Sequence, residues 1–193
     1  RAVSNHLKLP IVEETSVEEV NISKKTFKLK INGSDLVESK FVIWATGEFQ
    51  FPSLAPFKGA ELCIHNSQVN SWRDLEGDEF YIIGGFESGI DAAVNLSLFG
   101  KKVHVLDRNA PWEDRDTDPS LNLAPFTLER LRGQYPFGRI DLLKDSEIQH
   151  IKEKSGKYEI KIKGKSKPYI SKTKPILATG FKNKLPIVNE LFD

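Results

Sequence analysis

The sequence predicts an α/β fold with a parallel sheet, and three observations support this prediction. An apolar strand at residues 80–83 runs into a glycine-rich turn and then into a helical pattern. Two similar stretches, 17–47 and 148–180, lie on either side of that unit. Each of them ends in an apolar run followed by Ala-Thr-Gly. Strands that alternate with helices favour a parallel sheet covered by helices, here with a β-meander in each copy.

Residues 11–47, which contain the first copy, are predicted to be β-structure. Apolar side chains alternate with lysines over residues 27–31, so this strand should turn one face toward a core and the other toward water. The next two residues, Asn32 and Gly33, predict a tight turn. Residues 41–44 are all apolar, and we therefore expect a strand that is buried on both faces.

The central unit has the pattern strand, helix, strand. Residues 80–83 form the first strand, residues 88–99 place apolar side chains on one helical face, and Gly100 ends the helix at its C′ position. Residues 102–106 form the next strand. The whole unit has the size of a parallel βαβ unit, about thirty residues.

The stretch that follows is predicted in four parts. Residues 109–125 are polar and contain three prolines, which indicates an ordered loop. A short helix is expected at 126–131 and a third strand at 140–143. Residues 144–174 are rich in lysine, but the lysines alternate with apolar residues. That alternation is typical of the water-facing side of antiparallel strands and argues against a nucleic-acid patch.

The composition excludes several classes of protein. The chain has 39% hydrophobic and 28% charged residues, as an ordinary globular domain does, and its net charge of +1 creates no field for nucleic acid or an anionic membrane. No apolar run approaches the roughly twenty residues of a membrane span, and no secretory signal opens the chain. A single cysteine excludes an internal disulfide and is typical of a reducing cytoplasm. We therefore expect a cytoplasmic protein that binds neither nucleic acid nor membrane.

The turn at residues 84–89 is the strongest candidate binding site. Gly84 permits a tight exit from the strand, Gly89 lets the helix pack close to the sheet, and Ser88 with the following amides can face a phosphate. The usual G-x-G-x-x-G motif has a glycine where this chain has Phe86. Because Asp107 follows about twenty residues later, at the end of the second strand, we predict a dinucleotide site, with a purely structural turn as the alternative. The predicted cofactor-binding residues of the turn are Gly84, Gly85, Phe86, Glu87, Ser88 and Gly89.

Two further residues are predicted to bind the cofactor, and they favour different nucleotides. The carboxylate of Asp107 can accept hydrogen bonds from both ribose hydroxyls of NADH. The guanidinium of Arg108 favours the 2′-phosphate of NADPH. The sequence leaves the choice between NADH and NADPH open.

No catalytic residue and no metal site are assigned. Cys63 lies between two apolar residues and has no second cysteine nearby, so it is interpreted as a buried small hydrophobe. His65 is interpreted mainly as a structural hydrogen-bond partner, with a contact to the nucleotide as the alternative. Three acidic residues are interpreted as part of a solvated loop: Asp114, Asp116 and Asp118.

These features resemble a known superfamily. Two copies of an apolar strand ending in Ala-Thr-Gly, with residues 82–93 between them, resemble the FAD-dependent pyridine nucleotide oxidoreductases that have two dinucleotide-binding domains. Within that group the chain is most similar to the flavin-containing monooxygenases and to bacillithiol-disulfide-reductase-like flavoproteins. Residues 116–120, 125–127 and 175–181 strengthen the resemblance, which covers essentially the whole chain. The dithiol of the thioredoxin reductases is missing.

The resemblance implies a Rossmann-like NAD(P)H-binding domain inserted into a split FAD-binding domain. Residues 1–52 would end the first FAD segment, residues 53–174 would form the NAD(P)H domain, and residues 175–193 would return to the FAD domain. Pro52 and Pro56 would mark the first crossing. The glycine-rich FAD phosphate loop of the family is absent, so we expect a fragment that binds FAD poorly and is inactive alone.

The implied activity is hydride transfer from NADPH or NADH to FAD, after which the reduced flavin reacts with oxygen, as in a monooxygenase. A low-molecular-weight disulfide reductase, a non-catalytic NAD(P) sensor and a simple scaffold are the alternatives. A small-molecule substrate is expected, and a homodimer is one option. Near the flavin and the nicotinamide path the resemblance places the two Ala-Thr-Gly segments: Ala45, Thr46, Gly47, Ala178, Thr179 and Gly180.

Overall fold

The computed structural model describes residues 6–47, 51–113, 118–182, 187–188 and 191. The chain divides into two compact units, one formed by Arg1–Glu48 with Asn183–Asp193 and the other by Phe49–Lys182. We call them unit 1 and unit 2. The functional division predicted at residues 52 and 174 stays a prediction. In the described part of the chain, no helix has the length and apolar character needed to cross a membrane.

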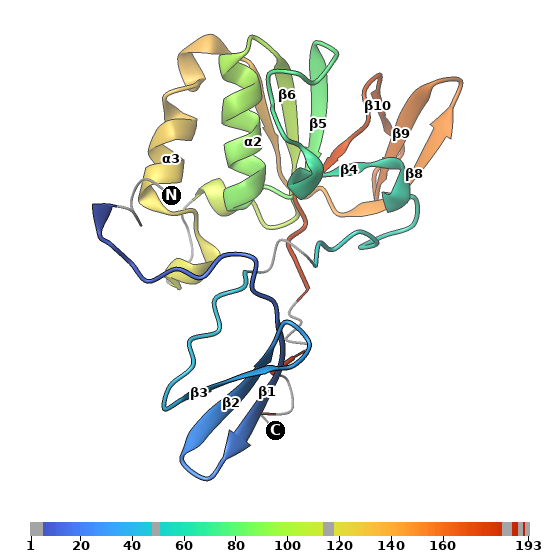
Figure 1. Ribbon diagram of the computed structural model, residues 1–193. Helices are drawn as coiled ribbons and strands as arrows, with labels where there is room; N and C mark the ends of the chain where they lie inside the picture. Colours follow the sequence, from blue (N-terminus) through green and yellow to red (C-terminus); the bar gives the residue numbers. More distant parts are fainter. Residues whose placement is uncertain (1–5, 48–50, 114–117, 183–186, 189–190, 192–193) are drawn as a thin grey trace. The chain divides into compact units, whose positions relative to one another are not determined.

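Unit 1 contains a three-stranded antiparallel sheet. Its strands are β1 (Val17–Ser23), β2 (Thr26–Ile31) and β3 (Asp35–Ser39), in the order β1-β2-β3 (Figure 1). Asn32 and Gly33 both have positive φ, 47° and 86°, and form the predicted turn between β2 and β3. The antiparallel pairs of this sheet make the first copy a β-meander, as expected.

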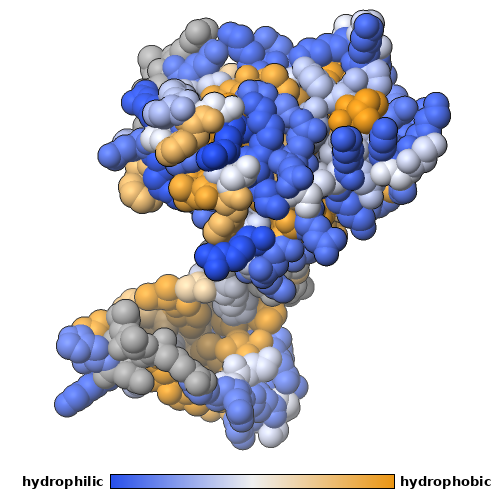
Figure 2. Space-filling model, turned by 90° about the horizontal axis from the view of Figure 1, so that it is seen from above, coloured by the Kyte–Doolittle hydropathy of each residue, from blue (hydrophilic) through white to orange (hydrophobic). Residues whose placement is uncertain are grey.

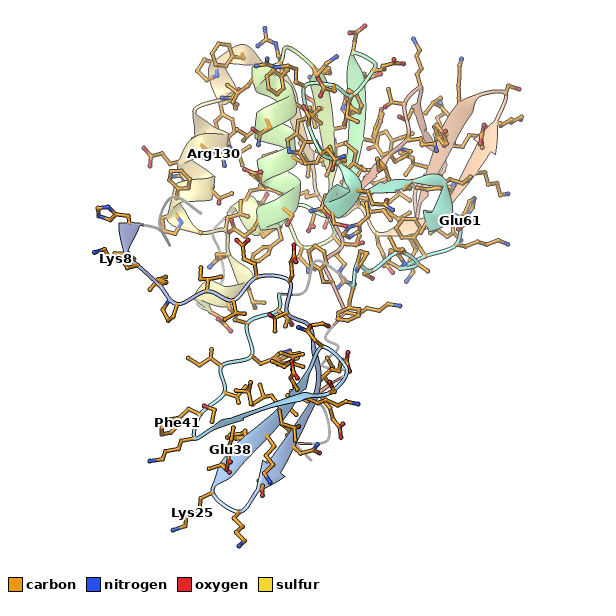
Figure 3. All side chains as sticks on the ribbon, in the orientation of Figure 1. Lys8, Lys25, Glu38, Phe41, Glu61 and Arg130 are labelled. Atoms are coloured by element: carbon orange, nitrogen blue, oxygen red, sulfur yellow. The ribbon has the colours of Figure 1, made fainter. Side chains whose placement is uncertain are left out.

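The strand predicted at residues 41–44 is wrong. Residues 41–47 have no regular secondary structure, and Phe41 and Ile43 are 83% and 90% exposed. Figure 3 shows the Phe41 side chain projecting from the segment that follows β3. An apolar run forms a buried strand only where neighbouring strands bind its backbone and both of its faces are covered. The sheet of unit 1 pairs β1, β2 and β3 and does not include this run.

Unit 2 is built on a parallel sheet of five strands, as the fold class predicted. The strand order is β4-β11-β5-β6-β7, and every pair in it is parallel. The strands are β4 (Ile64–His65), β5 (Glu79–Ile83), β6 (Lys102–Leu106), β7 (Ile140–Leu143) and β11 (Ile176–Leu177). Strand β11 lies last in the chain but is inserted beside β5 in the sheet.

Two layers cover this sheet (Figure 1). Helices α2 (Glu87–Leu98) and α3 (Pro125–Arg132) pack on one face, where Phe80 and Ile82 belong to their core. The meander β8 (Ile148–Lys154), β9 (Lys157–Ile162) and β10 (Tyr169–Ser171) packs on the other, where Tyr81 and Ile83 belong to its core. Successive residues of β5 therefore serve opposite layers, as strand geometry requires.

Among the residues that the structure describes, the loops contain five short 3₁₀ helices. They are η1 (Ala60–Leu62), η2 (Asn66–Gln68), η3 (Pro111–Glu113), η4 (Pro119–Leu121) and η5 (Tyr135–Phe137). Figure 2 shows one face, on which hydrophilic residues cover most of the larger unit and apolar residues are exposed over much of the smaller one.

Candidate nucleotide-binding site

The turn that joins β5 to α2 requires glycine at its first and last positions. Gly84 has φ of 100°, and a Cβ added there would lie 2.3 Å from the carbonyl oxygen of Ala178. A Cβ added at Gly89 would lie 1.9 Å from the carbonyl oxygen of Gly84. The amide of Gly84 also donates to the carbonyl of Leu106 at 2.9 Å, which ties the turn to the end of β6. Close backbone packing therefore accounts for both predicted glycines.

The amino end of α2 opens at this turn. Phe86 is the N-cap residue, and its side chain makes no capping hydrogen bond. The first amides of a helix have no partner within the helix, and the helix dipole places partial positive charge on them. Phe86 is 43% exposed, so its ring does not fill the core beneath the turn. An anionic group such as a pyrophosphate fits this end of the helix.

A pocket of about 420 Å³ lies against the first turns of α2. It is lined by Ser88 on that helix, by residues that follow β4 and by one residue of α3; the full lining is Asn66, Val69, Trp72, Glu87, Ser88, Asp91 and Thr127. Within the described part of the chain, the buried Oδ1 atom of Asn66 has no hydrogen-bond partner. Asn66 and Trp72 were not predicted as site residues. The sequence offered a signal only in the neighbouring His65, for which a contact to the nucleotide was the alternative interpretation.

The two acidic residues of this pocket already have partners. The Glu87 carboxylate accepts hydrogen bonds from the amide of Ala124 at 2.6 Å and from the Thr127 hydroxyl at 2.5 Å, so it caps the start of α3. Asp91 pairs with Arg130, which lies on α3 (Figure 3). Glu87, predicted to bind the cofactor, thus holds the two helices together at the edge of the site.

Asp107 lies at the end of β6, beside the turn. Its Oδ2 atom accepts a hydrogen bond from the amide of Gly85 at 2.7 Å. Its Oδ1 atom accepts from the amides of Asn109 and Ala110 at 2.7 and 3.0 Å. Arg108 is exposed to solvent. The structure therefore brings Asp107 to the predicted site, with its carboxylate bound to backbone amides.

The second Ala-Thr-Gly segment lies at the same edge of the sheet. The amide of Ala178 donates to the carbonyl of Ile83 at 2.8 Å, so this segment continues β11 alongside the turn. The hydroxyl of Thr179 donates to the carbonyl of Ser53 at 3.2 Å. The carbonyl of Gly180 accepts from the amide of the same serine at 3.0 Å. The first segment, Ala45 to Gly47, belongs to unit 1 and is exposed.

His65 is a structural residue in this geometry. It is buried, its Nδ1 accepts from the amide of Ser67 at 3.2 Å, and its Nε2 lies 3.1 Å from the carbonyl oxygen of Gly180. These partners fit the neutral ring with a proton on Nε2. Burial lowers the pKa of His65, an effect that the Gly180 carbonyl partly offsets.

The remaining candidates show no reactive chemistry. Cys63, interpreted from the sequence as a buried small hydrophobe, is partly buried, and burial raises the pKa of its thiol to about 12, with a smaller contribution from Glu61, so a thiolate is disfavoured. Asp118 caps η4 through the amide of Ser120, whereas Asp114 and Asp116 lie outside the described residues. Among the described residues, no group of three or more potential ligands could hold a metal ion.

A family model for pyridine nucleotide-disulphide oxidoreductases matches residues 1–193. The chain belongs to this family. A similar curated protein is the ferredoxin–NADP reductase of Gluconobacter oxydans, 28% identical over 138 residues, which are 69% of this chain and 38% of that protein. An indole-3-pyruvate monooxygenase of Oryza sativa is 24% identical over 87 residues, 43% of this chain and 21% of that protein.

Two examples represent the solved structures that share this fold. The bacillithiol disulfide reductase of Bacillus cereus has a TM-score of 0.70 at 22% identity, over 98% of this chain and 57% of that one. The flavin-containing monooxygenase of Stenotrophomonas maltophilia has a TM-score of 0.65 at 15% identity, with the same coverage. The chain spans about a third of the length of the curated reductase and just over half of each of these structures.

The residues of unit 2 fit the pyridine nucleotide that gives this oxidoreductase family its name. The turn and the open amino end of α2 offer backbone amides to a pyrophosphate, and glycine is required at both ends of the turn. Their place at the carboxyl edge of a parallel sheet is where such folds bind nucleotides.

Proposed function

We propose that the full-length protein carrying this chain is a flavoprotein oxidoreductase in which NADPH or NADH binds at residues 84–89 and reduces FAD. The reduced flavin would then pass its electrons to oxygen, as a monooxygenase requires. The observation that carries the proposal is the turn itself, whose glycines are required by packing and which leaves the amino end of α2 uncapped. When bound, the nucleotide supplies a hydride and FAD accepts it.

The chain's own residues would bind and orient the nucleotide. The α2 amides would hold the pyrophosphate, while the hydrogen bonds of Ser53 and His65 to Gly180 keep the neighbouring segment in place. The pocket beside Ser88 offers room and a free acceptor, Oδ1 of Asn66, to a polar part of the ligand. These roles are positional, since hydride chemistry belongs to the cofactors.

A disulfide reductase is the second candidate, supported by the likeness to the bacillithiol disulfide reductase fold. The properties of the single cysteine argue against a thiol mechanism within this chain. Cys63 is the only cysteine of the sequence, and its raised pKa of about 12 keeps it protonated at neutral pH.

The test is anaerobic stopped-flow absorbance of the full-length protein, loaded with FAD and mixed with NADH or NADPH. Rapid loss of the flavin band with one nucleotide is expected. A second mixing step separates the two candidates. One portion of reduced protein receives oxygen alone, another receives a bacillithiol-type disulfide without oxygen, and the acceptor that restores the band identifies the function. Nucleotide binding without any flavin would favour the sensor, and no bleaching with either nucleotide would overturn the proposal.

A matched pair of glycine variants tests the site within this experiment. Gly89→Ala places a methyl group against the carbonyl of Gly84, and we expect nucleotide affinity to fall at least tenfold. Gly100→Ala adds the same group beyond the other end of α2, where nothing lies within 4 Å but the positive φ of 80° strains any residue with a side chain, so this variant loses stability without touching the turn. Isothermal titration calorimetry should find normal affinity for the second variant. Equal losses in both variants would point to general damage and not to a site at the turn.

A further inference from the structure

We propose that Asp107 is a positioning residue for the nucleotide-binding turn and does not bind the ribose hydroxyls. This inference rests on the proposed function, because it requires a pyridine nucleotide at residues 84–89. It resolves the opposition between Asp107 and Arg108 that the sequence left open.

The hydrogen bonds of the carboxylate are the first line of evidence. Oδ2 accepts from the amide of Gly85, inside the turn, and Oδ1 accepts from the amides of Asn109 and Ala110, in the loop after β6. The three distances lie between 2.7 and 3.0 Å. One side chain therefore ties the glycine-rich turn to the loop that follows the next strand.

The number of hydrogen bonds that the carboxylate can accept is the second line of evidence. Each carboxylate oxygen has two lone-pair sites. Both sites of Oδ1 are used by backbone amides, and one site of Oδ2 is used by Gly85. A carboxylate that accepts hydrogen bonds from both hydroxyls of a ribose needs two free sites, and Asp107 retains one. It therefore cannot accept both hydroxyls without releasing the turn, and the remaining site lies on the oxygen that already holds Gly85.

Packing around Gly85 points the same way. A Cβ added at Gly85 would lie 2.3 Å from the Trp112 ring and 3.0 Å from Cβ of Asp107. The backbone of Asp107 is also held, since its amide donates to Leu143 at 3.1 Å and its carbonyl accepts from Ser146 at 3.0 Å. The backbone of Asp107 is thus held by hydrogen bonds to Leu143 of β7 and to Ser146, and its carboxylate faces the turn.

The shape of the turn therefore depends on Asp107, whichever nucleotide is bound. Removing the carboxylate should weaken NADH and NADPH by the same factor, because both share the pyrophosphate. Discrimination between the two would fall to the exposed Arg108, which would affect NADPH alone.

The experiment measures the affinity of the FAD-loaded full-length protein for NADH, NADPH and 2′-deoxy-NADH, with and without the substitution Asp107→Asn. Asparagine can keep the bonds to Asn109 and Ala110 but turns an NH₂ group toward the amide of Gly85, so one bond is lost and two donors meet. We expect affinity for all three nucleotides to fall by the same factor, about tenfold. The KM for NAD(P)H should rise while the limiting rate of flavin reduction stays within about twofold, which general damage to the fold would not produce.

Two controls keep the outcome decisive. Arg108→Gln alters the neighbouring side chain and should weaken NADPH only. The unaltered protein should bind NADH and 2′-deoxy-NADH equally, within about twofold, and this comparison needs no variant, so it decides the matter even if Asp107→Asn does not fold.

Two results would overturn the inference while leaving the proposed function intact. One is a loss confined to NADH, with weak binding of 2′-deoxy-NADH by the unaltered protein, which would make Asp107 the ribose acceptor. The other is unchanged affinity for all three nucleotides in a folded variant. Failure of the unaltered protein to bind any nucleotide would overturn the proposed function and this inference together.

Discussion

The two copies of the repeat have nearly the same strands and very different surroundings. In the first, β1 pairs with β2 and has a register shift between Val17 and Glu19; in the second, β8 pairs with β9 and has the same shift between Ile148 and His150. The two copies therefore share even this irregularity of register. They differ in how many of their side chains are buried, because the second meander packs on a parallel sheet and shares its core.

The difference is sharpest in the apolar run that ends each copy. Ile176 is fully buried in β11, between β4 and β5, whereas the equivalent Ile43 is 90% exposed. Each residue lies two positions before the alanine of Ala-Thr-Gly. An apolar strand pattern thus shows that a segment can form a buried strand, and the presence of neighbouring strands decides whether it forms one.

The largest expected effect comes from truncating this equivalent pair. Ile176→Ala should lower the free energy of unfolding of unit 2 by about 2–5 kcal/mol, because it leaves a cavity in a fully buried site. Ile43→Ala should change stability by less than about 0.5 kcal/mol, because the side chain is already in water. Urea denaturation of both variants measures the contrast, and similar losses in the two would contradict it.

An intermediate effect is expected at the alanines of the two Ala-Thr-Gly segments. Ala178→Val adds two methyl groups at a buried position whose amide is bonded to Ile83 beside the turn, so it should strain the turn and cost about 1–3 kcal/mol. Ala45→Val enlarges an exposed side chain and should be neutral. Nucleotide titration should show weaker binding for the first variant only. If the second weakened binding equally, the two segments would not differ as described.

The smallest expected effect concerns pH. Burial lowers the pKa of His65 in the folded state below its ordinary value, so the unfolded chain binds the proton more readily. The stability that the neutral ring contributes is present above about pH 6.5 and is lost as pH falls from there through the folded pKa. The ring of this histidine lies within hydrogen-bond distance of the Gly180 carbonyl. Among the described residues, no histidine makes the equivalent contact to Gly47 of the first copy.

Chemical denaturation at several values between pH 5 and 8 measures this effect. The unaltered protein should lose stability as pH falls, and His65→Gln should show a smaller loss over the same range. Its stability at pH 7.5 should be lower by about 1 kcal/mol, because hydrogen bonds to Ser67 and Gly180 are altered. Identical slopes in both proteins would show that His65 does not titrate on unfolding.

Local patterns were sufficient for the elements that depend on short stretches of chain. Backbone sterics account for the glycines at 84 and 89. The two-residue period of a strand accounts for the alternation in β2 and β9, and such a period can be read directly from the sequence. The strand-helix-strand unit could be predicted for the same reason, whereas its role as a nucleotide site stays a proposal.

Contacts between distant residues decided the rest. The insertion of β11 beside β5, the exposure of residues 41–44, and the hydrogen bonds that bind the Asp107 carboxylate to Gly85 all join segments far apart in sequence or depend on which neighbours a strand finds. The sequence alone determined the fold class, the repeat and the candidate turn. Only the tertiary structure decided which copy is buried and what the acidic side chain beside the turn can still bind, because both depend on hydrogen-bond partners and burial that no local pattern records.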